Sequence, residues 1–119
     1  MRRYLQTGTL SILLALAYGI LTWAAEDDGS QVKILSPQAN AVIQGDTVEL
    51  QYDLVKGTKA QHAHVYLDGQ YQKGFAGTFK GLAPGKHEIR VIAATQDDKV
   101  LAAESAVTVE VQAQGDTGY

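Results

Sequence analysis

Apolar and polar residues alternate along most of the chain after residue 30, and this period of two is typical of strands with one buried face. The alternation is clearest in residues 47–54, where every second side chain is apolar: Val48, Leu50, Tyr52 and Leu54. The positions between them are polar, so we expect this segment to bury one face and expose the other.

Seven further segments have strand-like composition: residues 31–35, 41–44, 61–67, 70–75, 78–82, 87–95 and 106–111. Turn residues separate them, and the strongest turn is Asp68-Gly69, a pair that favours a two-residue hairpin. We find no helical pattern of useful length after residue 25. About seven short strands with regularly spaced turns predict an all-β, immunoglobulin- or fibronectin-like sandwich.

The first residues form a pattern of their own, which predicts a secretory signal peptide. Arg2 and Arg3 precede an apolar run over residues 10–21, and small residues around Ala24 offer a cleavage site. The sequence therefore predicts a signal peptide over 1–24, an acidic linker over 25–30, a sandwich domain over 31–112 and a disordered tail over 113–119.

The alternative for the N-terminal segment is an uncleaved membrane anchor. Residues 9–25 are apolar over a length at the lower limit for a membrane span. A cleaved signal places the domain in the periplasm or outside the cell, free of the membrane, whereas an uncleaved one would tether it there.

Composition excludes several classes of function. The chain has no cysteine, so disulfides, thiolate metal sites and blue-copper electron transfer are excluded. The net charge is −3, and without Arg2 and Arg3 eight basic residues remain against thirteen acidic ones, or −5. That balance argues against nucleic acid and anionic lipid as partners. We expect a monomer, for which a protein partner is conceivable but not identified.

Three motifs carry a resemblance to a family. They are residues 34–43 (ILSPQANAVI), residues 62–69 (HAHVYLDG) and residues 82–89 (LAPGKHEI). The chain resembles small exported bacterial immunoglobulin-like domains of unknown function, which have a His-x-His strand ending in Asp-Gly and a later strand that begins L-x-P-G-x-H. The resemblance implies the fold and an exported location, and it brings no established activity.

The histidines are the chemically specific feature of these motifs. His62 and His64 point the same way from one strand, about 6–7 Å apart. His87 begins a later strand that neighbours the first in an immunoglobulin-like sheet. Three imidazoles with an open position suit Cu(II) or Zn(II), and Asp68 or Glu88 could orient a ring. His87 is a conditional third ligand in this hypothesis.

Side-chain parity leaves alternatives open. Ala63, Val65 and Leu67 form the more apolar set of their strand, which would turn the two histidines and Tyr66 outward, away from His87. If Tyr66 fills the core instead, the three histidines converge. In the simplest interpretation, the paired histidines are ordinary surface residues and His87 hydrogen-bonds a turn. A role in pH sensing or partner contact is a further alternative.

Other candidate sites are less specific. Tyr66 and Tyr71, with Asp68 in the turn between them, form a candidate binding strip for sugars or a partner protein, although packing is the commoner role. The acidic residues at 26–28 and 97–98 are expected to be solvated, because calcium needs six or more oxygen ligands. No catalytic motif is present, so we expect a non-catalytic binding module, with a purely structural or protein-interaction domain as the alternative.

Overall fold

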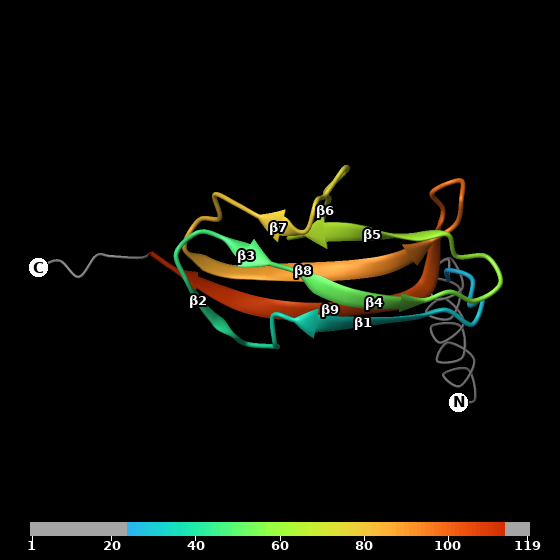
Figure 1. The fold of residues 1–119 in the computed structure, drawn as a ribbon, viewed down its shortest axis with the longest axis horizontal. Coiled ribbons are helices and arrows are strands. Elements are labelled where there is room, and N and C mark those ends of the chain that lie inside the picture. The colour runs from blue at the N-terminus through green and yellow to red at the C-terminus, as the bar shows by residue number, and fades with distance from the viewer. Residues whose placement is uncertain (1–23, 114–119) are drawn as a thin grey trace, which may run out of the picture.

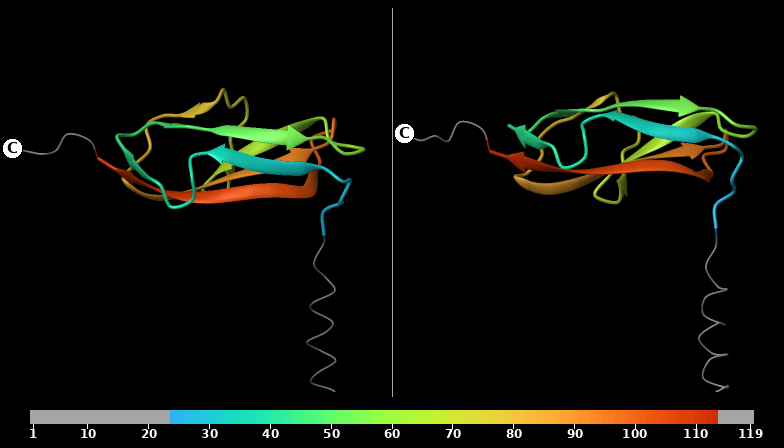
Figure 2. Two further views of the ribbon diagram at one scale, coloured as in Figure 1. Left: turned by 60° about the horizontal axis from the view of Figure 1, so that its bottom comes forward. Right: turned by 90° about the horizontal axis from the view of Figure 1, so that it is seen from below.

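The computed structural model describes residues 24–113, and all regular elements in this range are β-strands. The strands are β1 (Gln31–Ser36), β2 (Val42–Gln44), β3 (Val48–Glu49), β4 (Gln51–Val55), β5 (His62–Leu67), β6 (Gln70–Tyr71), β7 (Thr78–Phe79), β8 (Gly85–Ala94) and β9 (Val100–Gln112). The strands form two layers, and the side view shows β1 and β4 over β8 and β9 (Figures 1 and 2). The predicted signal peptide, apart from Ala24, lies outside the described residues, as does the tail after residue 113.

The strand order is that of an immunoglobulin- or fibronectin-like sandwich, as the sequence predicted. One layer holds the antiparallel pairs β1–β4 and β3–β7, and β3 and β4 are halves of one strand interrupted at Leu50. The other layer has the order β2-β9-β8-β5-β6, in which β2 runs parallel to β9 and the other pairs are antiparallel.

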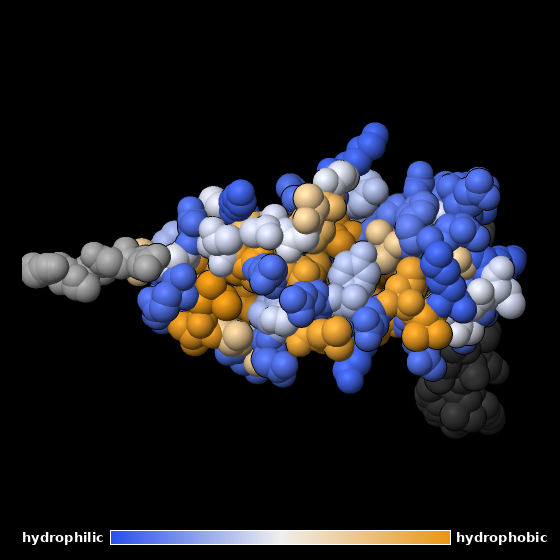
Figure 3. Space-filling model, in the orientation of Figure 1, coloured by the Kyte–Doolittle hydropathy of each residue, from blue (hydrophilic) through white to orange (hydrophobic). Residues whose placement is uncertain are grey.

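The core lies between the layers, where the inward faces of alternating strands meet. Its buried members include Val48 and Leu50 from one layer and Val65, Ile89 and Val91 from the other. The predicted inward face of residues 47–54 is confirmed, because Tyr52 and Leu54 also pack against buried clusters. The buried apolar side chains hold the two layers together without disulfides. On the face shown in Figure 3, polar and apolar side chains are interspersed.

Several strands differ in length from the prediction, and β7, for example, covers only Thr78–Phe79 of the predicted residues 78–82. β9 begins at Val100 rather than at residue 106, and Val100 already pairs with Ala94 at the end of β8. Its first half reads VLAAES, whose small side chains hide the alternation. The returning arm of the hairpin is only β6, and not residues 70–75, because the chain turns away after Tyr71.

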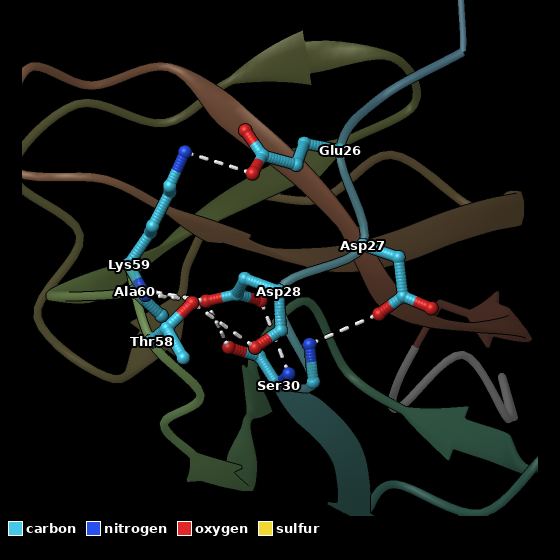
Figure 4. A network of polar contacts seen from close by, with 8 residues as sticks. Glu26, Asp27, Asp28, Ser30, Thr58, Lys59 and Ala60 are labelled. Carbon is cyan, nitrogen blue, oxygen red and sulfur yellow. Dashed lines mark hydrogen bonds and ion pairs between the residues drawn. The ribbon is translucent and has the colours of Figure 1, made fainter.

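The segment expected to be a solvated acidic linker is instead packed against the domain (Figure 4). Asp28 is buried, and its Oδ2 accepts hydrogen bonds from the amides of Lys59 at 2.8 Å and Ala60 at 2.9 Å. Its carboxylate also accepts from the backbone amide and hydroxyl of Ser30. The Ser30 hydroxyl does most to lower the pKa of Asp28, which falls to about 2. A solvated turn is the usual place for acidic residues, but here the carboxylate caps unpaired amides of the loop before β5.

None of the elements in residues 24–113 is a helix long and apolar enough to cross a membrane.

Candidate metal site

The candidate site begins on the outer face of β5. Val65 points into the core, so His62 and His64, at the opposite parity, point outward. Their rings stack with centroids 5.4 Å apart and an angle of 24° between the planes. The outward orientation that parity predicted is therefore observed, although it does not leave both rings exposed. His64 is only 6% exposed, whereas the His62 side chain is 44% exposed.

The third member of the site is Asp98, from the turn that joins β8 to β9. This turn is closed by hydrogen bonds from the amide of Asp98 to the Thr95 carbonyl at 3.0 Å and from the amide of Thr95 to the Lys99 carbonyl at 2.9 Å. Asp98 has a φ of 65°, a left-handed conformation that aspartate tolerates better than most residues. The turn thus fixes the direction of the Asp98 side chain.

The two imidazoles and the carboxylate converge on one point. The Nε2 atom of His62 lies 2.8 Å from Asp98 Oδ1, and the Nε2 atom of His64 lies 3.2 Å from the same oxygen. All three ligand atoms fall within 4.8 Å of one another. Hydrogen bonds from His62 and then from His64 lower the pKa of Asp98. The carboxylate is therefore held in its charged form.

These distances suit a small transition-metal ion. Zinc–nitrogen and zinc–oxygen bonds of about 2.0–2.2 Å place neighbouring ligand atoms of a tetrahedral site about 3.3–3.6 Å apart. The observed separations of 2.8 and 3.2 Å from Asp98 Oδ1 need to lengthen by less than about 1 Å to match. Two imidazoles and a carboxylate suit Cu(II) and Zn(II), and three protein ligands leave positions open.

The hypothesis that His87 joins the pair is not supported by this structure. β5 and β8 are antiparallel, with His62 opposite Ala94 and His64 opposite Ile92, so His87 lies at the far end of β8. His87 lies five positions along β8 from Ile92, the residue opposite His64, which is a distance of about 16 Å. His87 instead faces Asp68 at 2.6 Å and the Ala83 carbonyl at 2.7 Å. The turn contact expected in the simpler interpretation is therefore observed.

The candidate binding strip of Tyr66, Asp68 and Tyr71 does not form one continuous exposed surface. Tyr66 and Tyr71 face each other across the hairpin, and the Tyr71 ring lies 4.5 Å from that of His64. Tyr71 is 46% exposed, so it forms a cover over His64 that remains open to solvent. Asp68 occupies the hairpin turn at a φ of 52° and interacts with His87 rather than with the tyrosines.

Comparisons with known proteins agree with this architecture. A fibronectin(III)-like module of CbhA from Clostridium thermocellum matches with a TM-score of 0.57 and 23% identity, over 71% of this chain and 99% of the module. The PKD domain of human KIAA0319 matches at 0.47 and 15%, over 81% and 89% of the two chains. CopC from Methylosinus trichosporium OB3b matches at 0.43 and 16%, over 75% and 100%. The first likeness shows the fold, and the other two carry no further conclusion.

Neither a protein-family model nor a curated protein sequence matches the chain significantly.

Proposed function

We propose that the chain is an exported, non-catalytic immunoglobulin-like module that binds Cu(II) or Zn(II) through His62, His64 and Asp98. The observation that supports this is the convergence of two imidazole nitrogens on one carboxylate oxygen. Its export rests on the signal-peptide pattern of residues 1–24.

The surroundings of the cluster favour binding by a pre-formed site. His64 is held between its neighbours on β5 and the ring of Tyr71, which limits its rotation. The Thr95–Lys99 turn holds Asp98 independently. Side chains that are ordered before the metal arrives lose less conformational entropy when they bind it.

The exposure of the cluster favours binding over catalysis. The Asp98 side chain is 66% exposed, so the metal would lie at the surface of the sheet. Enzymes that use a metal to drive a reaction commonly exclude water from it. A surface position instead leaves the metal accessible for uptake and release.

A thermal melt of the mature chain, residues 25–119, tests the proposal in the presence and absence of Cu(II) or Zn(II). A ligand that binds only the folded state stabilises it by RT ln(1 + [L]/Kd), or about 2.7 kcal/mol at a hundredfold excess over Kd. We expect the metal to raise the melting temperature of the parent and to leave that of the His62→Ala/His64→Ala variant unchanged.

The control for loss of histidine in general is His87→Ala, compared with its own metal-free melt. Its metal-induced rise should match that of the parent, because His87 lies away from the cluster. Equal melting temperatures with and without metal in the parent would contradict the proposal and leave a structural or protein-interaction domain.

A further inference from the structure

A second polar cluster lies at the opposite end of β8 from the candidate metal site. His87 Nδ1 lies 2.6 Å from a carboxylate oxygen of Asp68, and His87 Nε2 lies 2.7 Å from the carbonyl oxygen of Ala83. A carboxylate and a backbone carbonyl can only accept hydrogen bonds. Both ring nitrogens must therefore donate, which requires the imidazolium form of His87.

The two acceptors belong to different parts of the fold. Asp68 lies in the hairpin turn between β5 and β6, where its backbone and carboxylate are tied to Glu88 by amide hydrogen bonds of 2.8 Å. Ala83 lies in the loop that leads into β8. His87 therefore joins the hairpin turn to this loop, and its side chain is only 14% exposed.

The loop at Ala83 forms one wall of a hollow of about 330 Å³ at this end of the sandwich. Leu82 and Pro84, on either side of Ala83, line it together with Gly45 and Asp46. The Leu82 amide donates to the Asp46 carbonyl at 3.0 Å. Two hydrogen bonds and the burial of Leu82 in the core hold this wall, and the hydrogen bond from His87 is titratable.

The charges around His87 favour its protonated form. Asp68 is the charged group that faces the ring, and Val109 of β9 stands opposite His87 in the sheet. The neighbouring residues Lys86 and Glu88 point to the other face, where Glu88 pairs with Arg90 at 2.8 Å. Hydrogen bonds to Ala83 and then to Asp68 raise the pKa of His87 above its ordinary 6.5.

We propose that protonated His87 is a pH-sensitive latch that holds the Ala83 loop against the hairpin turn and releases it when the ring loses one proton. The neutral ring keeps its proton on Nδ1, beside the negative charge of Asp68. Nε2 then presents a lone pair to the Ala83 carbonyl, and that contact is lost. This function is separate from metal binding and uses a different end of the sheet.

The direction of the pH effect follows from the raised pKa. The latch is complete below the pKa of an unfolded histidine, about 6.5, and is lost as the pH rises through the higher pKa of folded His87. Acidification therefore tightens this end of the domain, and alkaline conditions loosen it.

The test is a pH titration of the metal-free mature domain, labelled with ¹⁵N, in which the ring nitrogens of each histidine are followed by NMR. We expect both His87 nitrogens to be protonated at pH 6, with a pKa above 6.5 and an Nδ1–H form above it. The protection factor of the Leu82 amide against hydrogen exchange should fall several-fold as the pH rises through the same titration.

Two variants separate the latch from general effects on folding. Asp68→Asn keeps a residue that tolerates the left-handed turn, and it should lower the pKa of His87. Asp97→Asn removes a distant carboxylate and should leave that pKa unchanged. In His87→Gln the protection of Leu82 should no longer depend on a histidine titration.

Three results would overturn the latch. They are a His87 ring with one protonated nitrogen at pH 6, a pKa at or below 6.5, and Leu82 protection that stays constant while His87 titrates. None of them bears on the affinity of the His62 cluster for metal, so this proposal and the metal proposal fail independently.

Discussion

His64 Nε2 lies 3.2 Å from Asp98 Oδ1, although the two residues are 34 positions apart in the chain. The antiparallel pairing of β5 with β8 produces this contact. β8 ends opposite the start of β5, so the turn after β8 lies beside the first residues of β5. The turn after β8 therefore supplies the carboxylate that contacts the two histidines at the start of β5.

Asp98→Asn should weaken metal binding, because the variant replaces a charged ligand oxygen with a neutral amide. Loss of groups that merely orient a ligand costs about 10–100-fold in metal affinity, so loss of a direct ligand should cost at least tenfold. Isothermal titration with Zn(II) measures the change. Asp97→Asn alters the adjacent carboxylate of the same turn and is the matched control. Equal affinities for the two variants would remove Asp98 from the site.

Asp28 should make the domain sensitive to acid. Its pKa is lowered to about 2 in the folded state from 3.8, so its stabilising contribution is present above pH 3.8 and is lost as the pH falls through about 2. Asp28→Asn should reduce stability at neutral pH and flatten its dependence between pH 4 and 2. Urea unfolding at several pH values measures both effects. Parallel pH profiles for parent and variant would show that the carboxylate contributes nothing.

The N-terminal segment should be needed for full stability, contrary to its assignment as a linker. A chain that begins at Gln31 lacks Asp28 and Ser30, which cap the amides of Gly57, Lys59 and Ala60. We expect it to melt at a lower temperature than a chain that begins at Ala25. Removal of residues 114–119 is the control truncation. A shortened N-terminus without effect on the melt would restore the linker interpretation.

The two isoleucines of β8 should differ in their importance for stability. Ile89 is fully buried in the core, and Ile92 is partly buried on the other face. Ile89→Ala removes buried methyl groups and leaves a cavity, which costs about 2–5 kcal/mol. Ile92→Ala should cost less, since its neighbours and solvent can fill part of the space. The free energy of unfolding in urea compares them.

Local pattern was enough to predict much of the fold. The inward face of residues 47–54, the Asp68-Gly69 turn and the outward direction of His62 and His64 depend on neighbours within a few positions. The position of Asp98 could not be obtained this way, because it depends on which strand ends meet. The hypothesis that His87 is the third ligand rests on the adjacency of the two strands, and it fails because β5 and β8 run in opposite directions. The antiparallel pairing of these two strands is the signal that indicates the turn at 95–99 as the neighbour of His62 and His64.

The packing of the N-terminal segment also has a consequence for the cleavage that the signal-peptide pattern predicts. The Glu26 carbonyl accepts a hydrogen bond from the Ala102 amide at 2.8 Å, only two residues after the predicted cut at Ala24. A peptidase must hold the chain extended on both sides of the bond that it cleaves. If the chain is cut after Ala24 as the sequence predicts, cleavage and the packing of this segment compete for the same residues. Such a cut is then favoured before the Ala102 amide of β9 pairs with Glu26.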